Sequence, residues 1–135
     1  MFLTWRPPDR SDRQVAVLWA VCAAGCVALR PVWLGIAPLF PPCLWHEWSG
    51  LPCPGCGTRR SFLRLLDGDL LAGFALNPLA AATASAFVVV GLAAPLWLLA
   101  GGAVPALDSK RRPGWLAAGA AAMMANWAWL YVSGV

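Results

Sequence analysis

Three long apolar stretches, separated by short polar ones, dominate the pattern along the chain. They cover residues 15–29, residues 74–107, which contain no charge, and residues 115–132. A helix needs about 20 apolar residues to cross the hydrocarbon core of a bilayer. Because the first stretch is short, we expect its helix to continue past Arg30, whose side chain can reach the headgroups. The pattern therefore predicts an all-α integral membrane protein with three transmembrane helices, at 14–35, 77–101 and 115–132.

The polar stretches complete one membrane domain over residues 1–135. They are a loosely ordered polar arm at 1–13, a loop rich in Cys, Pro and Gly at 36–57, a short helix at 58–68 and a basic loop at 108–113. Apolar residues and arginines alternate with helical spacing in 58–68, which predicts an amphipathic helix. Such a helix lies at the membrane interface or forms part of a re-entrant hairpin.

Individual residues refine the predicted spans. Asn77 and Pro78 are typical of a helix start, because Asn caps the first turn and Pro loses no needed hydrogen bond there. Asn126 is the one strongly polar side chain of the third span, and we expect it to form an interhelical hydrogen bond. The first stretch also fits a signal peptide. A span is favoured there, because Ala23 replaces the bulky residue that precedes a lipoprotein cleavage cysteine.

Composition supports a membrane protein and excludes several functions. Charged residues make up 12% of the chain and hydrophobic ones 60%, whereas soluble domains carry about 25% charge. The net charge of +4 is expected from cytoplasmic flanks of spanning helices. Nucleic acid is not an expected partner, because no basic stripe is interleaved with aromatics. No catalytic triad or glycine-rich phosphate loop can be assembled, so an independent hydrolase or transferase is not expected.

The basic residues also predict the orientation of the chain. Six lie on one side of the predicted spans and four on the other. The first set is Arg6, Arg10, Arg13, Lys110, Arg111 and Arg112, and the second is Arg30, Arg59, Arg60 and Arg64. Because positive flanks favour the cytoplasm, we expect a multi-pass inner (plasma) membrane protein with its N-terminus inside and its cysteine loop outside.

The cysteine loop has the residue types of a zinc site. Its pattern is Cys-x2-His-x6-Cys-x2-Cys, formed by Cys43, His46, Cys53 and Cys56. Zinc takes four such ligands in a tetrahedron, and a Cys-Pro-x-Cys-Gly turn is common in zinc ribbons. Gly57 would leave the backbone free for the tight turn.

Two other interpretations of the same cysteines stay open. Cys53 and Cys56 can form a redox dithiol whose thiolates are stabilised by the start of the following helix, with Cys43 as a resolving thiol. Alternatively, Cys43 forms a structural disulfide with Cys53 or Cys56. The remaining two of the five cysteines, Cys22 and Cys26, are expected to pack as apolar residues in the first span.

Two charged residues near the loop are further candidates. Arg60 follows Cys56 by four residues, so on a continuous helix it would share a face with that thiol. It would stabilise a thiolate or bind a phosphate or headgroup, unless Arg59, Arg60 and Arg64 all lie at the headgroup level. Asp69 is a candidate partner for one of these arginines.

A family resemblance covers residues 43–79. The chain resembles an uncharacterised family of small bacterial integral membrane proteins, a domain of unknown function with the signature Cys-Pro-x-Cys-Gly-x-Thr/Gln-Arg, Gly-Asp and Asn-Pro-Leu. The matching residues are Cys43, Gly50, Cys53, Pro54, Cys56, Gly57, Arg60, Gly68, Asp69, Asn77, Pro78 and Leu79. Arg59 departs from the pattern at the Thr/Gln position. The resemblance implies a membrane location and no particular activity.

Together these observations predict two alternative functions. The first is a small membrane accessory or interaction protein whose cysteine loop is structural or binds a metal such as zinc. The second is a membrane thiol–disulfide oxidoreductase that uses Cys53 and Cys56. Expected partners are the lipid bilayer and either a second copy of the chain or another membrane protein, because small residues in the last two spans allow close helix packing.

Overall fold

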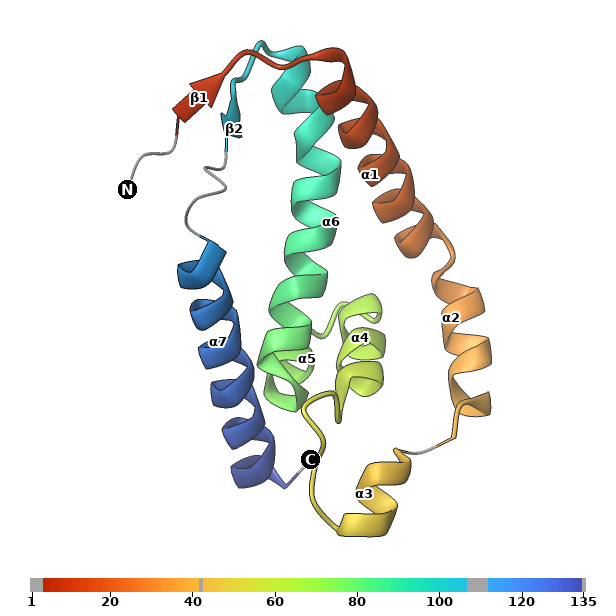
Figure 1. The fold of residues 1–135 in the computed structure, drawn as a ribbon. Coiled ribbons are helices and arrows are strands. Elements are labelled where there is room, and N and C mark those ends of the chain that lie inside the picture. Colours follow the sequence, from red (N-terminus) through yellow and green to blue (C-terminus); the bar gives the residue numbers. More distant parts are fainter. Residues whose placement is uncertain (1–3, 42, 107–111, 135) are drawn as a thin grey trace.

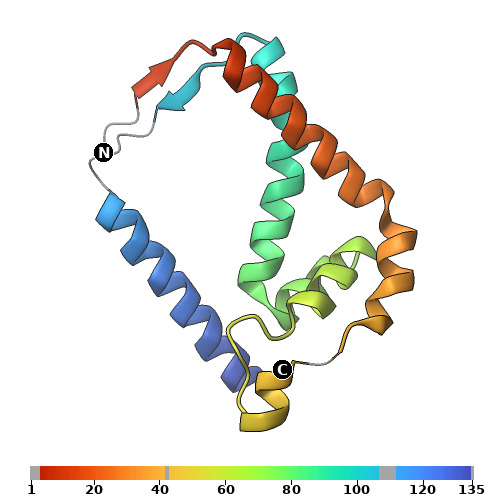
Figure 2. The same ribbon diagram turned by 45° about the vertical axis from the view of Figure 1, so that its right-hand side comes forward.

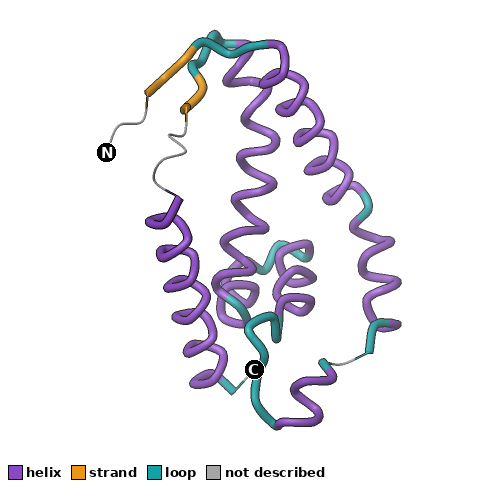
Figure 3. Tube along the Cα trace, in the orientation of Figure 1, coloured by secondary structure: helices purple, strands orange, loops and turns teal. Residues whose placement is uncertain are grey.

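The computed structural model describes residues 4–41, 43–106 and 112–134, and this part of the chain is mostly helical. A long helix, α6 (Pro78–Leu99), stands at the centre of the fold, with α1 (Arg10–Ala28) packed along it (Figure 1). α7 (Arg112–Ser133) approaches α6 near the Asn77 end of that helix. The order of helices and loops along the trace is shown in Figure 3.

The predicted first span, 14–35, is divided into two helices. α1 starts before it, at Arg10, where Asp9 and Asp12 form a capping box, and α2 (Arg30–Ile36) begins after a break at Leu29. Pro31 lies in the first turn of α2, where its ring disfavours a continuous helix through the residues before it. Arg30 does not extend freely from a span, because it forms an ion pair with Asp67 at 2.9 Å.

The segment predicted as a loop, 36–57, contains two short helices. They are the 3₁₀ helix η1 (Ala37–Leu39) and α3 (Leu44–Ser49). The amphipathic helix predicted at 58–68 is confirmed as α4 (Thr58–Leu66). A further helix, α5 (Leu70–Leu76), was not predicted.

α4 and α5 form a compact helical hairpin beside the start of α6. The buried Ser61 hydroxyl donates to the Gly73 carbonyl at 2.8 Å. A side chain at Gly73 would collide with Leu65, with a Cβ only 2.9 Å from Leu65 Cδ2. The two helices therefore meet through a small residue, and they place residues 52–57 against the Asn77 end of α6.

One helix in the described part of the chain, α6, is long and apolar enough to cross a membrane. At 22 residues it is about 33 Å long. The segments Arg10–Ala28 and Arg30–Ser49 reach the same criteria only together, as one broken span bent by 58°. α7 matches the third predicted span in position, but its glycines, tryptophans and Asn126 make it less apolar than α6. The described residues thus contain one candidate span, or two if the broken segment is a single span, and the three predicted spans are not shown.

α1 and α6 pack closely at Gly91, where a Cβ would lie 2.7 Å from Trp19 Cδ1 and 3.0 Å from the Cβ of Ala23. Near the Leu99 end of α6, β1 (Thr4–Arg6) pairs antiparallel with β2 (Val104–Ala106), and Trp5 lies opposite Pro105. The turned view in Figure 2 shows this strand pair and the segment around α3 at opposite ends of the molecule. Within the polar arm predicted at 1–13, residues 4–6 form β1 and residues 10–13 begin α1, whereas residues 1–3 and most of the basic loop predicted at 108–113 lie outside the described residues.

Candidate metal centre

Three of the five cysteines meet beside the Asn77 end of α6. The Sγ atom of Cys53 lies 3.5 Å from that of Cys43 and 3.3 Å from that of Cys56. All three sulfur atoms lie within 4.8 Å of one another. We call Cys43, Cys53 and Cys56 the cysteine cluster.

The local chain geometry explains how the cluster forms. Cys43 occupies the cap position before α3, and Cys53–Cys56 is a tight turn in which the Cys56 amide donates to the Cys53 carbonyl at 2.9 Å. The Cys53 amide in turn donates to Cys56 Sγ at 3.1 Å. Gly57 then has a φ of 78° at the start of α4, a conformation that residues with a side chain rarely adopt. The Cys-Pro-Gly-Cys-Gly sequence thus turns the chain back on itself and enters α4 directly.

Asn77 joins the cluster to α6. Its side chain is buried, and its amide nitrogen donates to the Cys56 carbonyl at 2.9 Å and to the Thr58 hydroxyl at 3.2 Å. Its amide oxygen accepts from the Ala80 amide at 3.0 Å and caps α6. The sequence predicted the cap but not the bonds to Cys56 and Thr58, because nothing local relates residues some 20 positions apart.

α7 holds the same loop from another side. Asn126 Oδ1 accepts from the Leu79 amide at 2.9 Å, so the predicted interhelical hydrogen bond is confirmed, and Asn126 Nδ2 donates to the Pro54 carbonyl at 3.4 Å. The Trp127 indole donates to the Pro52 carbonyl at 2.7 Å. Carbonyls of residues 52, 54 and 56 therefore each accept a side-chain hydrogen bond from a helix distant in sequence, which fixes the loop that carries Cys53 and Cys56.

Two thiols of the cluster, those of Cys43 and Cys56, differ in acidity. The His46 backbone amide at the start of α3, with help from Cys53, lowers the pKa of the Cys43 thiol below its ordinary value. Burial, reinforced by the neighbouring Cys53, raises the pKa of Cys56 to about 11. The redox interpretation expected the start of α4 to favour a thiolate at Cys53 or Cys56, whereas burial raises the pKa of Cys56.

Other predicted site residues lie outside the cluster. Within the described residues, the sulfur atoms of the three cysteines lie close enough together to share one ion, and His46 does not belong to this group. The His46 side chain is exposed on α3. Cys22 is exposed and Cys26 is half-buried in α1, and neither joins the group.

The charged candidates also take different roles from those predicted. Arg60 is exposed, with no side-chain hydrogen bond to another described residue. Asp69 caps α5 by accepting from the Ala72 amide at 3.0 Å, and it is Asp67 that pairs with an arginine, Arg30. Arg59 donates to the carbonyls of Ala37 and Phe40 at 2.9 and 2.7 Å. It thereby satisfies carbonyl groups that the end of η1 leaves free.

A comparison with known protein families gives a match over the part of the chain that contains the cysteine cluster. A family model described as "Protein of unknown function (DUF2752)" matches residues 43–91. The matched region contains the whole cysteine cluster, α3, α4, α5 and the first part of α6. No curated protein and no solved structure matches the chain. The match agrees with the expected resemblance to a family of unknown function, and it adds no activity.

The spacing of the sulfur atoms fits a metal centre. Thiolates bound to one tetrahedral zinc at about 2.3 Å lie about 3.8 Å apart, close to the 3.3 and 3.5 Å of the cluster. A disulfide would need about 2.05 Å. With three sulfur ligands in place, a fourth position would remain for a water molecule, a nearby side chain or a group from a partner.

Proposed function

We propose that the protein is a small membrane accessory protein whose cysteine cluster binds a soft metal ion such as zinc. The observation that carries this proposal is the convergence of three sulfur atoms from two separate segments, around Cys43 and around 53–56, within 4.8 Å of one another. Thiolate ligands favour zinc over hard cations such as magnesium or calcium. The hydrogen bonds from Asn77, Asn126 and Trp127 support this role, because contacts behind the ligands orient them toward an ion.

His46 remains our first candidate for the fourth ligand. It lies three residues after Cys43 on α3, and its exposed imidazole leaves it free to turn. If it does not bind, the fourth position belongs to water or to a partner. A partner ligand would suit an accessory protein, since it would couple docking to metal binding.

The membrane part of the proposal extends the one candidate span to three. α6 would cross the inner membrane, with the broken α1–α2 segment and α7 as further spans. β1 and the start of α1, which carry Arg6, Arg10 and Arg13, lie at the Leu99 end of α6 (Figure 1), and the hydrogen bond from Asn77 to Cys56 puts the cysteine cluster at the Asn77 end. Under the positive-inside rule, this arrangement supports a cytoplasmic N-terminus and a cysteine cluster at the outer surface.

Association with a second copy or another membrane protein is the remaining part of the proposal. Residues 114–125 of α7 are exposed throughout and consist mainly of Ala and Gly. Such small residues favour close helix–helix contact in lipid.

Metal analysis of the full-length protein tests this function. The protein is purified in detergent with zinc in the growth medium, and bound metal is measured by elemental analysis beside a count of free thiols. We expect one zinc per chain, with loss of the metal in Cys43→Ser, Cys53→Ser and Cys56→Ser. Cys22→Ser and Cys26→Ser are the matched controls and should keep it. Metal-free wild-type protein, or equal metal in cluster variants and controls, would contradict the proposal, and His46→Ala tests the fourth ligand separately.

A thiol–disulfide oxidoreductase is the second candidate. The 3.3 Å separation of the sulfur atoms of Cys53 and Cys56 supports it. The test is a Cys56→Ser variant expressed in cells. A mixed disulfide between this variant and another membrane protein, together with wild-type protein that contains no zinc, would favour this activity over metal binding.

A further inference from the structure

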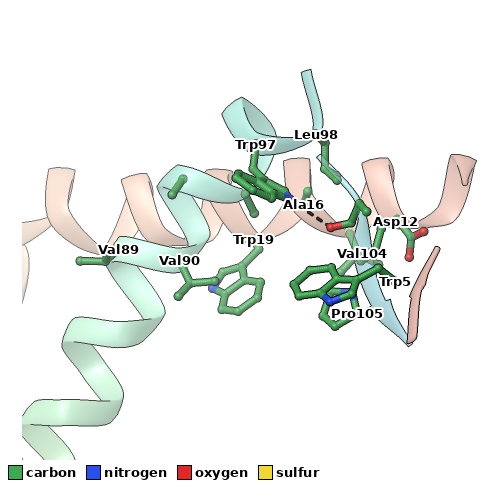
Figure 4. Close-up of a pocket in the computed structure, with 14 residues that line it drawn as sticks. Trp5, Asp12, Ala16, Trp19, Val89, Val90, Trp97, Leu98, Val104 and Pro105 are labelled. Atoms are coloured by element: carbon green, nitrogen blue, oxygen red, sulfur yellow. Dashed lines mark hydrogen bonds between the residues drawn. The ribbon is translucent and has the colours of Figure 1, made fainter. Parts of the chain in front are cut away.

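A large apolar pocket lies at the other end of α6, far from the cysteine cluster. It has a volume of about 610 Å³, within the roughly 300–1,000 Å³ of small-molecule sites. Its walls come from α1, α6 and the β1–β2 pair. Figure 4 shows the indole rings of Trp5, Trp19 and Trp97 around it, together with aliphatic side chains such as Val90 and Val104.

Asp12 and Trp97 have their polar groups engaged elsewhere, whereas the buried indole N–H of Trp19 has no hydrogen-bond partner among the described residues. Asp12 is the one charged residue of the lining, and its carboxylate oxygens accept from Arg6 at 2.7 and 2.9 Å. The Trp97 indole donates to the Ala103 carbonyl at 3.1 Å. Apolar pockets of this kind exclude water and accept apolar ligands, so the lining selects hydrocarbon.

The shape of the pocket is fixed by close packing. A side chain at Gly102 would collide with the Trp97 ring, so the glycine lets that ring lie flat against the chain before β2. Trp19 lies against Gly91 of α6 in the same way. Trp19 and Trp97, two of the three tryptophans around the pocket, are therefore held in place by contacts with glycine. The packing of α1 against α6 thus sets the shape of the pocket.

Two observations indicate the source of the hydrocarbon. The pocket includes Val89, Val90, Ala93, Ala94, Trp97 and Leu98 of α6, the helix that can cross a membrane. Arg13 does not line this pocket but a neighbouring one that shares Ala16 and Leu98 with it, and within the described residues Arg13 has no ion-pair partner. An unpaired cation beside an apolar pocket at the end of a span suits a phospholipid, with its phosphate near the arginine and its chain inside.

We propose that this pocket binds one acyl chain of a membrane phospholipid. The site is independent of the cysteine cluster and would hold a single lipid at the surface opposite to the metal centre. It would fill the space between α1, α6 and the strand pair, which the protein's own side chains leave open.

Photolabelling with lipid probes tests the proposal. Full-length protein in nanodiscs is exposed to phosphatidylglycerol that carries a photoreactive group on one acyl chain, and adducts are mapped by mass spectrometry. A parallel arm uses a photoreactive free fatty acid. We expect saturable labelling of the pocket walls by the phospholipid probe, competed by unlabelled phosphatidylglycerol.

A pair of α6 variants separates the pocket from the general lipid-facing surface. Ala93→Phe fills the pocket, whereas Ala82→Phe places the same ring at an exposed α6 position outside it. Ala93→Phe should lower wall labelling about tenfold, and Ala82→Phe should leave it unchanged, with both proteins showing wild-type helical signal and elution. Non-saturable labelling, or equal labelling in the two variants, would overturn the proposal. Labelling by the fatty-acid probe alone would overturn the phospholipid as the occupant.

Discussion

At its Asn77 end, α6 is joined to the cysteine loop and to α7 by directional hydrogen bonds, whereas at its Leu99 end it meets α1 and the strand pair through apolar contacts. The first end contains the buried amides of Asn77 and Asn126 and the three thiols. The second is formed by indole rings, aliphatic side chains and glycine contacts around a pocket. Hydrogen bonds fix angles as well as distances, so the first end suits an ion that needs fixed ligands and the second suits a hydrocarbon chain that does not.

The largest effect is expected from Asn77→Leu. This change removes the cap of α6 and leaves the buried Cys56 carbonyl without its donor, which together should cost about 3 kcal/mol of stability. Zinc affinity should fall with it, as measured by thermal unfolding and metal competition in detergent. Asn77→Ser is the matched variant, because its hydroxyl can still cap α6 but is too short to reach the Cys56 carbonyl. Equal zinc affinity in Asn77→Leu and wild type would break the link between this hydrogen bond and the cluster.

Gly91→Ala tests the apolar end. A Cβ there would lie 2.7 Å from Trp19, so we expect a loss of about 2 kcal/mol through overpacking. Zinc content should not change, because the contact is distant from the cysteine cluster. Gly119→Ala is the control, since a Cβ at Gly119 meets nothing within 4 Å. A fall in zinc content with Gly91→Ala would show that the two ends are not independent.

The cysteines should react in a fixed order when no metal is bound. The thiolate is the reactive form, and the pKa of Cys43 is lowered while that of Cys56 is raised to about 11. At pH 8, alkylation of Cys43 should therefore be about tenfold or more faster than that of Cys56. The Cys56 rate should keep rising with pH up to about 11. Both rates are followed by fragmentation of the alkylated peptide in a mass spectrometer, because tryptic cleavage leaves all five cysteines in one peptide, 14–59. Faster alkylation of Cys56 than of Cys43 would contradict the assigned environments.

The smallest effect is expected from two matched tryptophan changes on α7. Trp127→Phe removes the donor to the Pro52 carbonyl in the cysteine loop, and Trp129→Phe removes a donor to the Ala75 carbonyl in α5 at 3.0 Å. Each should cost about 1 kcal/mol of stability. Only Trp127→Phe should speed the loss of zinc to a chelator. The same zinc release in both variants would mean that α7 supports the fold but not the metal centre.

The sequence predicted the parts of this protein whose signals are local. Asn77-Pro78 marks the start of α6, the alternation in 58–68 marks α4, and the spacing of Cys53 and Cys56 marks the tight turn. The break at Leu29 also had a local signal, because Arg30-Pro31 disfavours a continuous helix.

The features that were missed depend on contacts between distant segments. β1 and β2 are three residues long, and they form because α1 and α6 bring residues 4–6 beside residues 104–106. The bonds from Arg59 to the end of η1 and from Trp127 to Pro52 have the same origin, since neither partner alone shows a pattern. The spacing along the chain also could not fix the direction of the His46 side chain. The imidazole is exposed on α3 and lies outside the group formed by the three cysteines, because its direction depends on side-chain rotation and not on its distance in sequence from Cys43.

X-ray absorption at the zinc edge, on the full-length protein purified in detergent, tests the metal centre most directly. We predict three sulfur neighbours at about 2.3 Å and one lighter neighbour, with the sulfur count falling by one in Cys43→Ser. A shell of oxygen and nitrogen alone, or a sulfur count that does not change in Cys43→Ser, would contradict binding of the metal by the cysteine cluster.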